Sequence, residues 1–353
     1  MMPGTSDDNH KLALKISGKS LEKNDLLMQD LMLKTIHESN FSEAQRIKEL
    51  LDFISSDNEQ SLTQNGHALS MGNAAAQINT IASTNDLTSG LNFITNTNLL
   101  SREISNNGNL DLYIDHLRSI KSKISDHPSH SFLASSVNLN ELNLNCDLKS
   151  DIPNISIQEL ADVQSESYGW ITGSQVSFCA EAFPSVDSRH EDAPALTILG
   201  AVLRNGYLHS AIREKGGAYG SGASQDSHNK VFKFFSYRDP KCTDTFEEFD
   251  NSRKWSLENI TSEQLDEGIL GVISSIDKPL SPYGEAISDF INELDNKSQE
   301  DRLLFRSRVK DCTLDDLVKV SKKYLFGNSK KSVLAGESFK EEISKLGFDI
   351  KNI

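Results

Sequence analysis

The residues whose types and spacing best suit chemistry flank a glycine-rich corner. Arg213 precedes Gly216 and Gly217, Tyr219 follows them, and further glycines stand at positions 220 and 222. Arginine presents a fixed positive charge with several N–H donors, and tyrosine presents a phenol. Glycines let the backbone turn sharply and let a second chain approach closely. Such a corner could bind a peptide backbone.

The same side chains have ordinary structural roles as alternatives. An arginine near a helix end often satisfies the last carbonyls, and a tyrosine at a strand start often packs half-buried. Lys215 and Arg238 are weaker candidates for a site, because such side chains more often pair with nearby acids in solvent. The acidic run from Asp244 to Asp250 favours a helix N-terminus, although inside a chamber it would also attract basic peptides.

A helix and a hairpin are predicted to hold the corner. Apolar residues recur at helical spacing from His190 to Arg213, with a predicted break at Asn205-Gly206. Beyond the glycines the pattern changes to the period of two that is typical of strands, including Val231 to Tyr237. Pro240 then ends the strand, because proline cannot donate to the ladder.

Composition narrows the range of partners. The chain has 353 residues and a net charge of −15, from 36 Lys and Arg against 51 Asp and Glu. Such a charge repels phosphate backbones and anionic lipid, and no apolar run approaches the ~20 residues that span a bilayer. We expect neither nucleic acid nor a membrane as a partner. Four cysteines without a CxxC pair favour reduced thiols in an intracellular compartment.

Catalytic motifs are missing from the sequence. No HxxEH helix is present, and His127 and His130 are separated by a proline. No GxSxG elbow marks a serine nucleophile, and Cys179 lies in a strand pattern that favours a core role. The glycines form neither a Walker loop nor a dinucleotide fingerprint, so we expect no nucleotide binding. No residue of the chain is predicted to bind metal.

The chain contains an internal repeat. Residues 40–51 align with residues 259–270, each opening with Asn, an apolar residue and a capping box, and each precedes a Ser-x-Leu-Ala segment. The first copy begins with a predicted strand at His10 to Ile16, has its Ser-x-Leu-Ala strand within Ser131 to Val137, and lacks an opening half. We predict an α+β fold in which each module packs helices on a mainly antiparallel sheet. The predicted divisions are a module at 1–137, a connecting segment at 138–166 and a second module at 167–353.

The segments Ile212 to Gly220 (IREKGGAYG), Ser236 to Pro240 (SYRDP) and Phe249-Asp250 together carry a family resemblance. They resemble the C-terminal half of the M16 (pitrilysin) zinc metallopeptidases, in the presequence-protease branch that includes falcilysin. The resemblance extends from about residue 11 to residue 346. It implies four modules in the whole enzyme, with the later part of the third, truncated at its N-terminal side, and all of the fourth in this chain.

The resemblance also implies a function. In this family the arginine and tyrosine that match Arg213 and Tyr219 hydrogen-bond substrate backbone beside a zinc ion held by the other half, and Gly216 and Gly217 would admit the peptide. The expected partners are the N-terminal half of the same protein and unfolded peptides, with Zn²⁺ in the full-length enzyme alone. The chain by itself is expected to be inactive. The full-length protein is expected to be intracellular, and its organelle is left open, with a mitochondrion and a plastid as the candidates. The alternative is a non-catalytic M16-like peptide-binding or scaffold subunit.

Overall fold

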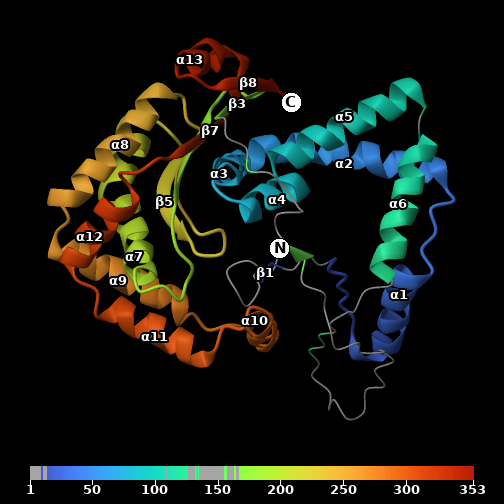
Figure 1. The fold of residues 1–353 in the computed structure, drawn as a ribbon, viewed down its shortest axis with the longest axis horizontal. Helices are drawn as coiled ribbons and strands as arrows, with labels where there is room; N and C mark the ends of the chain where they lie inside the picture. Colours follow the sequence, from blue (N-terminus) through green and yellow to red (C-terminus); the bar gives the residue numbers. More distant parts are fainter. Residues whose placement is uncertain are drawn as a thin grey trace. The chain divides into compact units, whose positions relative to one another are not determined.

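The computed structural model describes residues 9–10, 14–108, 110–125, 132, 134, 155–156, 163 and 167–353. The chain forms two compact units, each assembled from separate stretches of sequence. One unit takes in residues 1–56, 97–156 and 280–296, and the other takes in residues 57–96, 157–279 and 297–353. Figure 1 labels the α-helices and several of the strands of both units.

The regular secondary structure described in the first unit is helical apart from one short ladder. Its helices are α1 (Asp25–His37), the first part of α2 (Ala44–Gln64), the second part of α5 (Leu91–Asn107), α6 (Leu110–Ser125) and α10 (Pro282–Leu294). Strand β1 (Asn9–His10) pairs with β2 (Ile155–Ser156). The strand predicted at residues 10–16 is wrong from Leu14 to Ile16, which belong to no strand, because a strand needs a neighbour for its backbone groups. The strand predicted at residues 131–137 lies outside the described residues, apart from Phe132 and Ala134.

The second unit is organised around a six-stranded mixed sheet. The strands are β3 (Tyr168–Thr172), β4 (Phe178–Pro184), β5 (Gly220–Asp226), β6 (Val231–Tyr237), β7 (Lys330–Gly336) and β8 (Asp349–Asn352), in the order β5-β6-β4-β7-β3-β8. The pairs β5–β6, β6–β4 and β4–β7 are antiparallel, whereas β3 runs parallel to both β7 and β8. The predicted α+β class with a mainly antiparallel sheet is confirmed for this unit.

Helices cover both faces of this sheet (Figure 1). On one face lie α7 (Ala193–Leu203), η4 (Arg204–Lys215) and α8 (Thr243–Glu258), with α9 (Ser262–Ile276), α11 (Gln299–Lys310) and α12 (Leu314–Tyr324) packed on α7. On the other face lies α3 (Gly66–Ala76), followed by α4 (Thr80–Ser89). The two faces follow from the alternation of β4: Cys179 and Phe183 pack in the core with α7, and Phe178 packs with Leu69 of α3.

Close approach of α3 to the sheet requires a glycine at its first position. A Cβ atom added to Gly66 would lie 2.6 Å from the ring of Phe178, closer than real contacts allow. The covering of the sheet by α3 had no counterpart among the sequence predictions. The predicted module boundaries around residues 138–166 remain predictions, since most of that segment lies outside the described residues.

The helix before the corner changes type without breaking. Residues 204–215 form a π-helix that directly continues α7. At the predicted break at Asn205-Gly206 the chain therefore stays helical and changes from α-helical to the wider π-helical turns. A Cβ atom on Gly206 would lie 2.8 Å from the Trp255 ring, so the glycine allows α8 to approach closely. The capping box predicted at the start of α9 is confirmed by Thr261 and Gln264. No helix among the described residues is both long and apolar enough to cross a bilayer.

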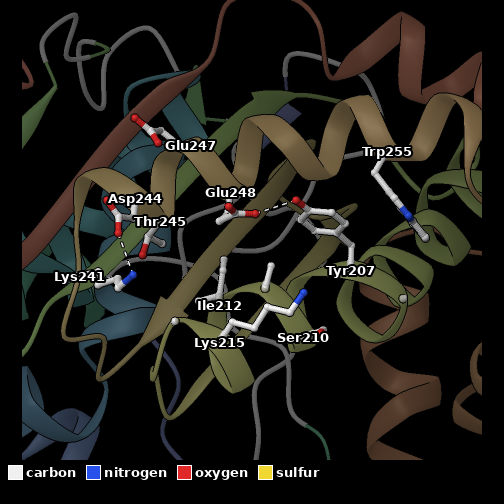
Figure 2. Close-up of a pocket in the computed structure, with 13 residues that line it drawn as sticks. Tyr207, Ser210, Ile212, Lys215, Lys241, Asp244, Thr245, Glu247, Glu248 and Trp255 are labelled. Carbon is white, nitrogen blue, oxygen red and sulfur yellow. Dashed lines mark hydrogen bonds and ion pairs between the residues drawn. The ribbon is translucent and has the colours of Figure 1, made fainter.

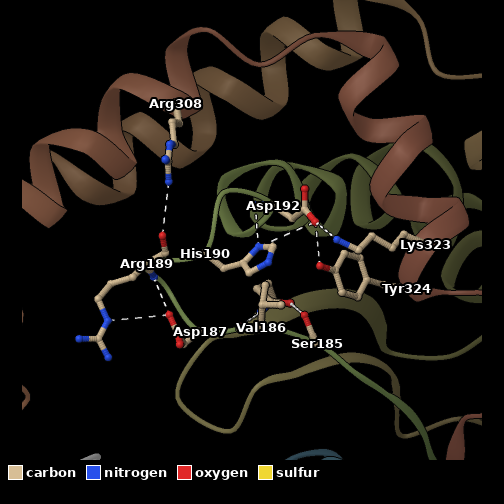
Figure 3. A network of polar contacts seen from close by, with 10 residues as sticks. Ser185, Val186, Asp187, Arg189, His190, Asp192, Arg308, Lys323 and Tyr324 are labelled. Carbon is tan, nitrogen blue, oxygen red and sulfur yellow. Dashed lines mark hydrogen bonds and ion pairs between the residues drawn. The ribbon is translucent and has the colours of Figure 1, made fainter. Parts of the chain in front are cut away.

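Asp192 ties the start of α7 to the end of α12 (Figure 3). Its buried carboxylate accepts hydrogen bonds from Lys323 Nζ at 2.6 Å and from the Tyr324 hydroxyl at 2.8 Å. Burial opposes ionisation of Asp192, but the bonds from Lys323 and Tyr324 outweigh it and hold the pKa of Asp192 below its usual range.

Replacing Asp192 by asparagine is therefore expected to lower the free energy of unfolding at pH 7 by about 1–2 kcal/mol, since charge-assisted bonds are lost. A carboxyl whose pKa is depressed on folding stabilises the protein above its unfolded pKa, and this stabilisation is lost as the pH falls through the folded pKa. Urea titrations from pH 7 to pH 3 should show the difference between wild type and variant shrinking. Asp315→Asn, an exposed acid on α12, is the control and should change stability by less than ~0.5 kcal/mol. If the loss of unfolding free energy in Asp192→Asn were the same at every pH, the stabilising role of the ionised Asp192 carboxylate would be wrong.

Candidate functional site

Arg213 lies in the last turn of η4 with its guanidinium exposed. Its NH1 group lies 3.2 Å from His209 Nε2, one turn earlier on the same helix. His209 Nδ1 in turn lies 3.6 Å from Glu214 Oε1. Arg213 is thus turned toward its own helix and still open to solvent.

The glycines after Arg213 make the corner that the sequence predicted. Gly217 has φ +86°, in the left-handed region that favours glycine, and its N–H donates to the Arg213 carbonyl at 3.1 Å. Ala218 N–H donates to the Ile212 carbonyl at 3.1 Å. A Cβ atom on Gly216 would lie 2.4 Å from the Ile212 carbonyl oxygen. Both glycines are therefore needed to end η4, whether or not a peptide approaches them.

Tyr219 follows the corner, immediately before β5. Its N–H donates to the Arg238 carbonyl at 3.3 Å, and its side chain is 67% exposed. The ring lies edge-on to Tyr237, with the centroids 5.6 Å apart and the planes at 77°. The phenol of Tyr219 is thus available to a ligand while its ring rests on a neighbour.

A groove of about 650 Å³ lies between η4 and α8, next to the corner (Figure 2). Lys215 and Gly216 line one side, but Arg213 and Tyr219 do not belong to the lining. Tyr207 donates to Glu248 Oε2 at 2.7 Å, and burial, reinforced by Glu248, raises the pKa of Tyr207 to about 12. Figure 2 shows Tyr207 and Glu248 pointing toward each other, and a dashed line between Lys241 and Asp244. Lys241 Nζ lies 2.8 Å from Asp244 Oδ2. Tyr207 therefore stays protonated at neutral pH and acts as a hydrogen-bond donor.

The described residues offer no arrangement that fits a zinc ion. Within that part of the chain, no three His, Cys, Asp or Glu side chains come together as a candidate metal site. His190 is used in a turn, where its Nδ1 accepts from Asp192 N–H at 3.0 Å. Cys179 is fully buried in β4, as predicted, with its sulfur 3.8 Å from that of Cys242. His127 and His130 lie outside the described residues.

Three residues near the corner were missed by sequence reasoning as parts of a site. His209 precedes Arg213 by four residues, which was a usable signal for contact along one helix face. Glu214 follows Arg213 directly and lies near His209 five residues earlier, a contact that depends on the π-helical turn. Tyr237 was interpreted as a strand end, and its contact with Tyr219 depends on the register of β5 and β6, in which Gly220 faces Tyr237. That register could not be read from the sequence.

Known proteins are similar to this chain in both halves. A family model described as PreP C-terminal domain matches residues 171–334, and one described as associated with subfamily C of the M16 peptidases matches residues 2–100. The mitochondrial presequence protease of Drosophila melanogaster is 29% identical over 320 residues, which cover 88% of this chain and 30% of that protein. The mitochondrial presequence protease of Saccharomyces cerevisiae is 26% identical over 377 residues, which cover 99% of this chain and 37% of that protein.

The chain thus spans about a third of the length of the curated relatives that it matches. Among solved structures, a crystal structure of pitrilysin resembles it with a TM-score of 0.53, over 94% of this chain and 36% of that chain. The sequence identity in that comparison is 10%, so the likeness shows the fold alone.

Proposed function

Because this chain belongs to the M16 peptidases of the presequence-protease branch, we propose that it forms the C-terminal, non-zinc-binding portion of a zinc oligopeptidase. The complete enzyme would enclose and hydrolyse unfolded peptides of limited length. Residues 1–137 would be the later part of the third module, residues 138–166 a connection, and residues 167–353 the fourth module. The names of the relatives support a mitochondrial location for the complete enzyme.

Arg213 and Tyr219 carry this proposal. Both side chains are exposed at the two ends of one glycine corner, inside the segment that matches the PreP C-terminal domain. We propose that each donates a hydrogen bond to a carbonyl of the bound peptide. Such donors orient the peptide and stabilise the charge that develops on the carbonyl oxygen in the transition state.

Zinc would supply the activated water of peptide hydrolysis in the complete enzyme. The described residues of this chain do not fit that ion, so its ligands and the general base are assigned to the N-terminal half. The chain's own contribution is to bind the peptide beside the corner and to hold the donors there. Gly216 and Gly217 present their backbone without side chains, which lets the peptide come close to Arg213.

The isolated chain is expected to hold no stoichiometric zinc and to cleave no peptide, because it lacks the zinc-binding half. Elemental analysis of the purified chain and a fluorogenic peptide assay would measure both. Adding the separately produced N-terminal half should restore hydrolysis that a chelator abolishes. A complex that binds peptide but never cleaves it would favour the non-catalytic scaffold alternative, and zinc-dependent cleavage by the chain alone would overturn the proposal.

A further inference from the structure

The side chain of Tyr219 is exposed, but a neighbouring aromatic ring supports its own ring. A side chain that is 67% exposed normally samples several rotamers, and each hydrogen bond it makes to a ligand then costs conformational entropy. Here the Tyr219 ring stands edge-to-face against Tyr237, at a centroid distance typical of favourable aromatic pairs. Tyr237 is only half-buried, so this contact lies at the surface, where the phenol would meet a peptide.

Arg238 fixes both partners of this pair. Its guanidinium carbon lies 5.3 Å from the centre of the Tyr237 ring, within the range of a cation–π contact. Its carbonyl accepts the N–H of Tyr219. Arg238 also has φ +48°, a conformation that L-residues rarely adopt and that tends to occur where the surrounding structure enforces it. The unusual backbone of Arg238 therefore places its carbonyl under Tyr219 and its side chain over Tyr237.

Two rings from other elements support Tyr237 on its remaining sides. His67 of α3 lies 4.7 Å away at 67°, and Phe178 of β4 lies 5.8 Å away at 45°. Burial lowers the pKa of His67, and its Nδ1 has no hydrogen-bond partner among the described residues. A neutral His67 imidazole adds no second positive charge beside the Tyr237 ring, which already has the Arg238 guanidinium over it. Tyr237 is thus held by His67, Phe178 and Arg238 at once.

We propose that Tyr237 is a positioning residue for Tyr219. It holds the Tyr219 ring in one orientation, so that the phenol is already placed when a peptide arrives. Tyr237 acts through its ring face and edge, and its own hydroxyl is not required. This inference rests on the proposed function, in which the Tyr219 phenol donates to the peptide.

The experiment is a double-mutant cycle in the complete enzyme, with Tyr237→Leu and Tyr219→Phe made singly and together. Tyr237→Leu is expected to lower kcat about two- to tenfold, the range expected for loss of one aromatic pair, with KM nearly unchanged. Tyr237→Phe keeps the ring and should restore most of the rate. In the Tyr219→Phe background, Tyr237→Leu should have little further effect, because the donor it positions is already gone.

The outcomes separate this inference from the proposed function. If Tyr219→Phe lowers the rate and Tyr237→Leu does not, the positioning role is wrong and the proposed function stands. If Tyr237→Leu lowers kcat by the same factor in the wild-type and Tyr219→Phe enzymes, Tyr237 acts through something other than the Tyr219 phenol. The positioning role is then again wrong. If Tyr219→Phe has no effect, the proposed role of Tyr219 fails and the inference fails with it.

A second measurement does not depend on activity. Incorporation of 3-fluorotyrosine gives the 353-residue chain one ¹⁹F signal per tyrosine, and the signal missing from Tyr219→Phe identifies residue 219. Tyr237→Leu should shift and narrow that signal as the ring gains freedom, whereas Tyr237→Phe should leave its width unchanged. Tyr283→Leu, which removes an exposed tyrosine on α10, is the matched control and should leave the Tyr219 signal where it was. An unchanged Tyr219 signal in Tyr237→Leu, with the thermal midpoint preserved, would refute the contact as a restraint.

Discussion

Replacing Arg213 by alanine is expected to lower kcat/KM of the complete peptidase about a hundredfold. A donor aimed at charge that develops in the transition state typically contributes ~3 kcal/mol, and about 1.4 kcal/mol corresponds to a factor of ten. Arg213→Lys should recover little of this loss, because an ammonium lacks the planar fork of donors. Steady-state kinetics with a fluorogenic peptide would measure the change.

The stability of the chain should survive this substitution. Arg213 is exposed, and its contact with His209 is a single bond at the surface, so Arg213→Ala is expected to change the free energy of unfolding by less than ~0.5 kcal/mol. Arg102→Ala, an exposed arginine on α5, removes the same charge and should leave kcat/KM unchanged. Normal turnover by Arg213→Ala would remove this residue from the mechanism.

Apolar residues recur at helical spacing at 263–276, 283–294 and 314–325, and each stretch predicts a helix whose boundaries carry local signals. These predictions agree with α9, α10 and α12 to within a residue or so. Each helix begins after a Ser or Thr whose side chain accepts a backbone N–H, at Thr261, Ser281 and Thr313. Capping is a short-range interaction, so the sequence around each boundary contains the information that sets it.

Features set by distant contacts could not be predicted. β8 was missed because four residues, Asp349 to Asn352, hold too little alternation, and they form a strand by pairing with β3. The placement of α3 on the sheet depends on contacts between residues far apart in the sequence, such as that between Gly66 and Phe178. The candidate site divides in the same way. The Arg213 corner is local and was predicted, whereas the support of Tyr219 by Tyr237 depends on strand register.

Replacing Asn73 by alanine is expected to lower the free energy of unfolding by about 3–4 kcal/mol, the largest stability change predicted here. Asn73 on α3 is fully buried, and its amide connects three elements. Its Oδ1 accepts from Trp170 Nε1 of β3 at 3.1 Å and from the Ser332 hydroxyl of β7 at 2.9 Å. Its Nδ2 donates to the Asp86 carboxylate of α4 at 3.2 Å.

Alanine would leave all three partners buried and short of a hydrogen bond. Asp86 is the most costly of them, because burial already raises the pKa of its carboxyl despite bonds from Asn92 and from the Leu91 N–H. Removing the Asn73 donor should raise the pKa of Asp86 further. A carboxyl with a raised folded pKa destabilises the protein when it must ionise. The loss of stability caused by Asn73→Ala should therefore shrink as the pH falls from 7 toward the ordinary carboxyl pKa of about 4.

Chemical denaturation at several pH values would test both the size and the sign of this effect. Asn96→Ala, at an exposed position of α5, is the matched control and should be neutral or slightly stabilising, since alanine is the better helix former. Asn73→Ala also loosens the helix that brings His67 against Tyr237, so the ¹⁹F signal of Tyr219 should shift and narrow, as in Tyr237→Leu, at temperatures well below unfolding. A loss of less than ~1 kcal/mol would mean that water replaces the amide, and that α3 is held by its apolar contacts alone.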